Sequence, residues 1–161
     1  MKTLKPIAVS IIMVAVSSWS LAAWAESNAQ KPSFISIKSS EIKWTDAPSI
    51  APGAKIAVLE GDLKAEGPIM FRLMVPAESK FDVHTHPTVE RVTVISGSVH
   101  FAIGDQFDTE KTEEYMPGDA FIVPADTPMY GFTKQETVFQ IQGDGPWGIH
   151  FLHSEDAHKK Q

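Results

Sequence analysis

Short apolar runs that alternate with polar residues constrain this chain more than any other feature. In residues 68–75, Phe71, Leu73 and Val75 fall on one side of an extended segment, and Met70, Arg72 and Met74 fall on the other. Glycine, proline and aspartate end the runs, and no window of helical period stands out after residue 25. The pattern predicts many short strands, as in a β-sandwich or a closed β-barrel.

The alternating runs place the expected strands along most of the chain. With 10 Gly and 11 Pro spread over 161 residues, a single domain is expected. We expect a lead-in with a first strand over residues 26–42, the barrel over residues 43–152 and a tail over residues 153–161. The expected strands are residues 33–38, 54–60, 68–75, 91–96, 98–103, 120–123, 129–133, 137–141 and 147–152.

The first 25 residues have the pattern of a secretory signal peptide. Lys2 and Lys5 form a basic start, residues 7–16 form an apolar stretch too short to span a membrane, and a small-x-small cleavage site ends at Ala25. We expect cleavage after Ala25, which places the protein in the periplasm or outside the cell without stable membrane insertion. An uncleaved signal anchor is the alternative.

Charge and cysteine content exclude several classes of function. The chain has 14 Lys and Arg and 20 Asp and Glu; losing Lys2 and Lys5 leaves 12 basic residues against 20 acidic ones, a net charge of −8 with histidine neutral. This balance argues against a nucleic-acid partner or an anionic membrane surface. With no cysteine, the chain has no disulfide, no thiol nucleophile and no thiolate ligand.

The stretch from His84 to Glu90 carries the most chemical information. Residues two apart in an extended segment point to the same side, so His84 and His86 can present both imidazoles to one point. Pro87 bends the chain, and Glu90 opens the next expected strand, where its carboxylate can reach the same place. Two imidazoles and a carboxylate form a ligand set for divalent Fe, Mn, Ni, Zn or Cu, with positions left open for water or a small molecule.

This stretch resembles the first conserved motif of the cupin superfamily. His84, His86, Glu90 and Gly97 stand at the motif's spacing, and residues 118–124 resemble the start of the second motif. The resemblance is to single-domain, cupin type-2 bacterial proteins. It implies an all-β fold, the double-stranded β-helix or jelly-roll barrel, here after a signal peptide. It also implies a metal site on the two histidines and the glutamate.

Three positions depart from the motifs. The family usually has a glycine where Glu78 stands and another where Asp126 stands. It usually places a metal-binding histidine where Met129 stands, so the usual fourth ligand is missing. A thioether is a soft, weak ligand that suits mainly Cu(I).

Position 129 admits three interpretations. Met129 packs inside the barrel while three ligands and water hold the metal, or the metal is lost and a binding cup remains, or the two histidines and Met129 bind copper. Tyr130 is a candidate hydrogen-bonding group, with a barrel-wall role as the alternative. His150 and His100 are candidate fourth ligands because both lie in expected strands.

Several other residues have a structural alternative. Glu90 could form a surface ion pair with Arg91 or Arg72, and Trp147 is expected to pack at a tight turn. Gly97 is expected in a turn between two strands. Large apolar side chains are expected either to line a pocket around the metal or to form ordinary core: Phe71, Met74, Phe121, Phe132 and Phe139.

Two classes of function follow. The first is a metal-dependent enzyme of oxygenase or isomerase type that acts on a small molecule by dioxygen activation, isomerisation or attack by metal-bound water. The second is a non-catalytic periplasmic module that binds a ligand or a metal with a degenerate site. Likeness of fold cannot choose between them, because this barrel hosts many activities. The resemblance also implies a homodimer as the candidate assembly.

Overall fold

The structure is a computed structural model that describes residues 34–152. The chain divides into two compact units, residues 1–35 and residues 36–161, and every strand described lies in the second unit. The expected signal peptide and the expected tail lie outside the described residues. In the described part of the chain, no helix has the length and apolar character needed to cross a membrane.

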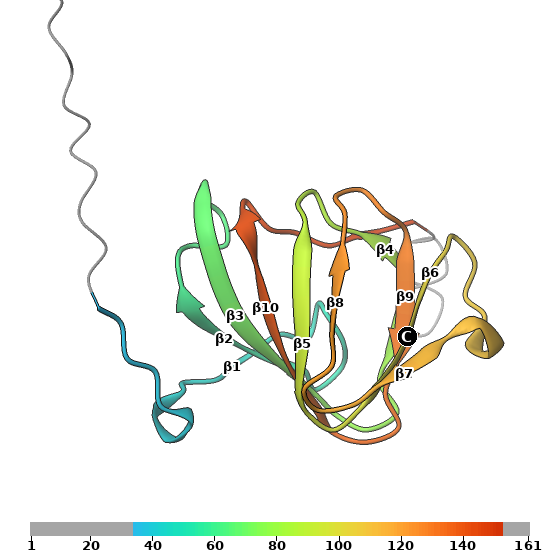
Figure 1. The fold of residues 1–161 in the computed structure, drawn as a ribbon, viewed down its shortest axis with the longest axis horizontal. Coiled ribbons are helices and arrows are strands. Elements are labelled where there is room, and N and C mark those ends of the chain that lie inside the picture. Colours follow the sequence, from blue (N-terminus) through green and yellow to red (C-terminus); the bar gives the residue numbers. More distant parts are fainter. Residues whose placement is uncertain (1–33, 153–161) are drawn as a thin grey trace, which may run out of the picture. The chain divides into compact units, whose positions relative to one another are not determined.

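Two antiparallel sheets build the fold, as Figure 1 shows. The six-stranded sheet has the order β1 (Thr45–Asp46), β2 (Lys55–Glu60), β3 (Gly67–Val75), β10 (Thr137–Gly145), β5 (Glu90–Ser96) and β8 (Ala120–Val123). The five-stranded sheet has the order β11 (His150–Phe151), β4 (Lys80–Thr85), β9 (Met129–Phe132), β6 (Val99–Ile103) and β7 (Glu113–Tyr115). Two 3-10 turns, η1 (Ser39–Glu41) and η2 (Thr109–Lys111), complete the elements. This is the all-β jelly-roll barrel that the sequence predicts.

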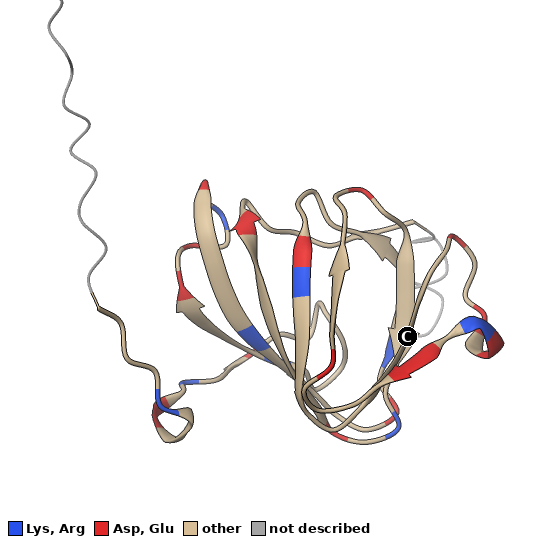
Figure 2. Ribbon diagram, in the orientation of Figure 1, with Lys and Arg blue, Asp and Glu red and all other residues tan. Residues whose placement is uncertain are grey.

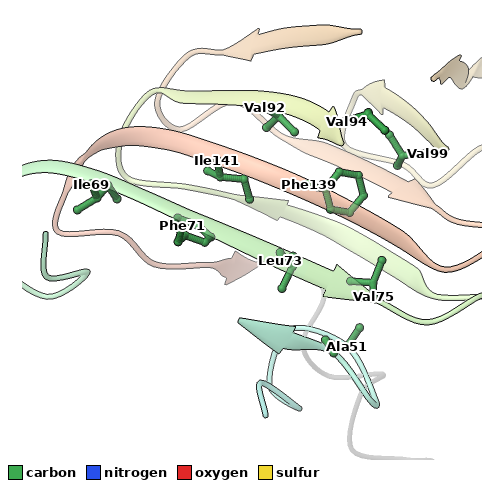
Figure 3. Close-up of a cluster of buried hydrophobic side chains, with 11 residues drawn as sticks. Ala51, Ile69, Phe71, Leu73, Val75, Val92, Val94, Val99, Phe139 and Ile141 are labelled. Atoms are coloured by element: carbon green, nitrogen blue, oxygen red, sulfur yellow. The ribbon is translucent and has the colours of Figure 1, made fainter. Parts of the chain in front are cut away.

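The hydrophobic core forms on the inner face of the six-stranded sheet, where strand alternation places apolar side chains (Figure 3). Phe71 and Val75 on β3 are fully buried, and Leu73 between them is 6% exposed. Phe139 and Ile141 on the neighbouring β10 join the same cluster. Because burying one such side chain contributes about 1.5–3 kcal/mol, the alternation in 68–75 gives this strand a substantial share of the stabilisation of the core.

Charged residues avoid this interior. Figure 2 shows most Lys, Arg, Asp and Glu in loops and toward strand ends. Among the described Asp, Glu, Lys and Arg residues, Glu90 alone is buried, at 4% exposure, while its neighbour Arg91 is exposed. A buried carboxyl is costly unless it has partners, so Glu90 marks a position where something other than folding sets the residue type.

Most of the expected strands match observed ones to within a few residues, although β10 extends four residues beyond the expected end at Ile141. Two expectations are wrong. Residues 34–38 form no strand, and the apolar residues there are exposed, because a pattern becomes a strand only where a partner strand is available. In residues 147–152 only His150–Phe151 is a strand.

Three observed strands were not expected: β1, β4 and β7. In β4 the polar residues His84 and Thr85 are buried beside apolar Val83, which interrupts the alternation on which the sequence prediction depends. The sequence pattern therefore fails to predict β4 because His84, the first candidate ligand, is a polar residue at a buried position.

The turn at Gly97, between β5 and β6, is confirmed. Its φ is +76°, and a Cβ there would lie 2.3 Å from the carbonyl oxygen of Glu136. Glu78 and Asp126 also have positive φ, at 58° and 57°. These two positions therefore keep the left-handed backbone that a glycine adopts easily, although each now carries a side chain.

Candidate metal and small-molecule site

His84, His86 and Glu90 come together at one end of β4 and the start of β5. His84 lies in β4, His86 follows the strand's last residue, and Glu90 opens β5. Their exposures are 7%, 4% and 4%, and all three line one cavity. The rings of His84 and His86 are 4.9 Å apart between centroids, and Nε2 of His86 lies 3.4 Å from Oε2 of Glu90.

Backbone carbonyls fix the orientation of both imidazoles. Nδ1 of His84 lies 2.6 Å from the carbonyl oxygen of Asp82, and Nδ1 of His86 lies 2.6 Å from that of Gly148. A carbonyl oxygen can only accept, so each Nδ1 carries the hydrogen. In the neutral ring, each Nε2 is then left with a free lone pair, which is the state of a metal-ligating histidine.

The cavity keeps both rings neutral. Burial lowers the pKa of His84, and it lowers the pKa of His86 to about 4, although the carbonyl contacts oppose the shift in each case. The charge on neighbouring His84 lowers the pKa of His86 further. Both imidazoles can therefore act as ligands at neutral pH without first losing a proton.

Glu90 is held by Trp147. The indole N–H of Trp147 donates to Oε1 of Glu90, and the indole stacks on the His86 ring at 5.2 Å and an interplanar angle of 21°. Burial raises the pKa of Glu90 to about 7, and the hydrogen bond from Trp147 opposes that rise. Between about pH 4 and about pH 7, the close His86–Glu90 contact is thus a neutral pair rather than an ion pair.

These contacts correct two alternatives drawn from the sequence. Glu90 does not form a surface ion pair with Arg91 or Arg72, because it is buried against Trp147 and His86. Trp147 is more than a packing residue, since it contacts one candidate ligand through its N–H and another through its ring. Nothing in the sequence near Trp147 indicates this role, because both partners lie far away along the chain.

Met129 lies beside the site. It is opposite His84 in the β4–β9 pairing, is 3% exposed and lines the cavity. Residues directly opposite in an antiparallel pair face the same side, so the thioether lies on the same face as the His84 imidazole. The structure is compatible with Met129 either as a packing residue or as a neighbour of a bound group.

Of the other candidate ligands, Tyr130 lines the cavity, and His150 and His100 do not. Tyr130 borders the cavity, but its hydroxyl donates to the carbonyl of Asp108 at 3.2 Å. His150 is exposed, pairs with Thr85 and does not line the cavity, although, in addition to burial, its charge contributes to lowering the pKa of His86. His100 stacks on Phe132 at 4.5 Å. Tyr130 is therefore a wall residue, and neither extra histidine joins the site.

The donor set has the chemistry of a divalent metal site. It offers two neutral imidazole nitrogens and one carboxyl, which suit the transition metals from Mn to Zn. Across residues 34–152, no three His, Cys, Asp or Glu side chains are positioned to hold a metal ion as they stand. A bound ion would therefore require deprotonation of Glu90 and movement of the ligand side chains toward one another.

The rest of the cavity is apolar. Of the large side chains expected around a metal, Phe121 and Phe139 line it, whereas Phe71 packs in the core with its ring 4.9 Å from that of Trp147. Phe101 stacks on Phe121 at 4.2 Å. Phe101, Phe121 and Phe139 therefore give the cavity an aromatic lining beside the candidate ligands.

Comparison with solved structures shows the fold of known cupins. Polyketide cyclase RemF from Streptomyces resistomycificus matches with a TM-score of 0.60 and 17% identity over 74% of this chain and 86% of that one. An RmlC-like cupin from Shewanella frigidimarina matches at 0.55 and 15%, over 70% and 91%. KdgF from Halomonas sp. matches at 0.53 and 16%, over 71% and 94%. Identities this low establish the fold alone.

Sequence comparison gives a family without an activity. No curated protein matches the chain significantly. Residues 22–150 match the family described as a domain of unknown function, DUF4437, which covers most of the chain and all of the candidate site. The chain is therefore a member of the DUF4437 family, with the fold of a cupin barrel.

Proposed function

We propose that this barrel binds a small organic molecule beside a divalent transition-metal ion held by His84, His86 and Glu90. One observation carries the proposal: both Nδ1 atoms are tied to backbone carbonyls, which leaves two lone-pair nitrogens beside a buried carboxyl at the wall of an apolar cavity. Folding alone does not require this arrangement, because three buried polar groups could be replaced by apolar ones at lower cost.

Each residue has a separate part in the proposed site. The carbonyls of Asp82 and Gly148 hold the two imidazoles in the required tautomer. Glu90 supplies the negative charge, and Trp147 orients its carboxyl. When bound, a divalent ion supplies Lewis-acid polarisation of an oxygen on the small molecule.

Metal loading of the purified protein tests the proposal. We expect about one equivalent of Zn²⁺ or Mn²⁺ to remain after dialysis and to raise the Tm. A stabilisation of about 2.7 kcal/mol is expected at 100 times the Kd. His84→Ala and His86→Ala should abolish both effects, whereas His100→Ala is the matched control that keeps them. Metal retained equally in all three variants would overturn the proposal.

Met129→His tests whether position 129 contributes to the metal site. Because Met129 lies opposite His84 and lines the cavity, a histidine there would supply the nitrogen ligand that the cupin motif usually has. We expect tighter metal binding than in the parent, measured by competition with a chelating dye. Unchanged affinity would mean that this side chain does not reach the ion.

A metal-free binding cup is the second candidate function. It is favoured by the thioether at position 129 and by the lack, among the described residues, of three side chains already placed for a metal. In that case Glu90 remains protonated beside neutral His86 and the pocket binds an apolar molecule directly. Ligand binding in protein that retains no metal after loading would favour this function.

We also infer that the protein is exported. The support is the basic, apolar and small-residue sequence of residues 1–25 and the absence of cysteine, which suits an oxidising compartment. Outside the cytoplasm, a cavity that binds a small molecule would serve the uptake, the sensing or the conversion of that molecule.

A further inference from the structure

The lining of the cavity restricts what it can bind. His84, His86 and Glu90 are its only ionisable side chains apart from Tyr130, among the residues that the structure describes. The hydroxyl of Tyr130 and the indole N–H of Trp147 are engaged with Asp108 and Glu90. The other described lining residues are aliphatic, aromatic, methionine or glycine. All polar recognition is therefore concentrated at one wall.

We propose that the ligand is a compact, mostly apolar molecule, no larger than about one six-membered ring, that carries a single hydroxyl or carbonyl oxygen, rather than a polyol or an anion. This inference rests on the small-molecule binding proposed above and names the class of molecule. The oxygen would face the two histidines and Glu90, and the ring would lie against Phe101, Phe121 and Phe139.

The volume of the cavity limits the size of the ligand. The free volume is about 70 Å³. This is about half of the roughly 150 Å³ of an engineered apolar cavity that binds benzene, so a single six-membered ring is the upper limit for a ligand here. A fused polycyclic ligand would require the walls to move.

The apolar lining argues against a polyol. A buried hydroxyl without a hydrogen-bond partner weakens binding by about tenfold. The described lining contains no Ser, Thr, Asn or Gln side chain, so hydroxyls beyond the first one or two would meet Val92, Val99, Ile141 or aromatic rings. A sugar ring would lose more affinity from these groups than it gains from burial.

The lining also argues against an anion in the metal-free protein. Among the described lining residues there is no Lys or Arg. The one ionisable group besides histidine and Tyr130 is Glu90, and a carboxyl group cannot supply the positive charge that a bound carboxylate would need. Transferring an unpaired charge into such a cavity is strongly unfavourable.

Three ligands on one carbon ring test the proposal: cyclohexanol, myo-inositol and cyclohexanecarboxylate. Binding to metal-free protein is measured by titration calorimetry, and the tryptophan fluorescence of a Trp44→Phe variant of the processed chain, in which Trp147 lines the cavity, gives a second readout. We expect cyclohexanol to bind at least about tenfold more tightly than either other compound. Equal or tighter binding of inositol, or of the carboxylate, would overturn the proposal.

A charge introduced into the lining should change the preference. Ile149 lines the cavity and is partly exposed, so Ile149→Arg places a cation where the protein can accommodate it. We expect this variant to bind cyclohexanecarboxylate about tenfold more tightly than the parent. The matched control is Ile122→Arg, on the exposed side of β8 and outside the lining, which should leave all three affinities unchanged.

Repeating the cyclohexanol and inositol titrations with Zn²⁺-loaded protein separates this inference from the metal proposal. If cyclohexanol binds but no metal is retained, the metal proposal fails and the ligand class stands. If metal is retained but inositol binds as tightly as cyclohexanol, the ligand class is wrong and the metal site stands. Binding of neither ring to either form would also overturn the ligand class.

Discussion

Glu90 has the least ordinary environment of any charged residue described. Burial raises its pKa from 4.5 to about 7, so the folded protein without metal favours the protonated acid. A raised carboxyl pKa adds stability that is fully present below pH 4.5 and is lost as the pH rises through 7. Metal binding requires the deprotonated form of Glu90, so the affinity of the proposed site for a metal ion is expected to fall as the pH is lowered below 7.

The Glu90→Gln variant should reveal this linkage in metal-free protein. Relative to Glu90→Gln, the parent is expected to lose stability between pH 4.5 and 7, by on the order of 1 kcal/mol per pH unit. Urea unfolding at several pH values measures the difference. Glu66→Gln, an exposed residue outside the cavity, serves as the control. Parallel profiles for the parent and Glu90→Gln would show that this carboxyl is not buried in the protonated form.

Glu78 and Asp126 are the residues where side chains occupy a glycine-like backbone. Both are exposed and have φ near +57°. The N–H of Asp126 donates to the carbonyl of His86 at 2.8 Å, so this turn also helps to hold a candidate ligand. The left-handed conformation costs a non-glycine residue about 1–2 kcal/mol, and less for Asp than for Glu.

Replacing Glu78 with glycine should stabilise the protein. Relief of the unfavourable φ exceeds the entropy that glycine adds to the unfolded chain, which is roughly 0.5–1 kcal/mol, so a net gain of up to about 1 kcal/mol is expected. Thermal or urea unfolding measures it. Glu78→Ala keeps a Cβ at the same φ and should give no gain. A Glu78→Gly protein that is less stable than Glu78→Ala would contradict this account.

At the scale of elements, the connection between β10 and β11 links the two sheets through the site. The N–H of Trp147 donates to the carbonyl of Leu63 at 2.7 Å, its indole donates to Glu90, and the carbonyl of Gly148 accepts from His86. A segment without regular secondary structure thus supports both kinds of candidate ligand. Loss of such a supporting contact typically lowers metal affinity by about 10–100-fold.

Trp147→Phe removes the indole N–H while keeping an aromatic ring. We expect metal affinity to fall by about 10–100-fold with the fold intact, because Glu90 loses the donor that orients it. Competition with a chelating dye measures the affinity, and circular dichroism checks the fold. Trp44→Phe, a partly buried tryptophan outside the cavity, is the control. If the metal affinity of Trp147→Phe equals that of the parent, the role of Trp147 is packing alone.

At the scale of the whole molecule, the acidic barrel and the N-terminal sequence bear on location. The chain has net charge −6, and removal of two lysines with the first 25 residues would make it −8. This negative charge argues against binding to an anionic membrane surface. The homodimer implied by the cupin resemblance stays a prediction, to be checked by light scattering of the purified protein.

Export predicts a new N-terminus at Glu26. Expression in a bacterial host, followed by cell fractionation and N-terminal sequencing, should place the processed protein in the periplasm. Ala25→Leu removes the small residue that the cleavage enzyme requires and should leave the precursor uncleaved. The control is Ala22→Leu, which leaves both small residues of the expected cleavage site in place. Full-length protein in the cytoplasm would refute the signal-peptide assignment.

The sequence alone was enough to predict the class of fold and the proximity of His84, His86 and Glu90, which line one cavity. The alternation of Phe71, Leu73 and Val75 is a local property of an extended backbone, so it could be recognised before any tertiary contact was known. The same period of two explains why His84 and His86 were expected on one side. The strand over residues 34–38 was predicted wrongly, because strand formation also depends on a partner that local pattern does not reveal.

Only the tertiary structure decided what surrounds those residues. Trp147 is 57 residues from Glu90 and Gly148 is 62 residues from His86 in the sequence, so neither contact leaves a local signal. The same is true of His150 and His100, whose directions depend on which strand each one pairs with. Backbone geometry determines local periodicity, whereas burial and hydrogen-bond partners are determined by the packing of segments that are distant in the sequence.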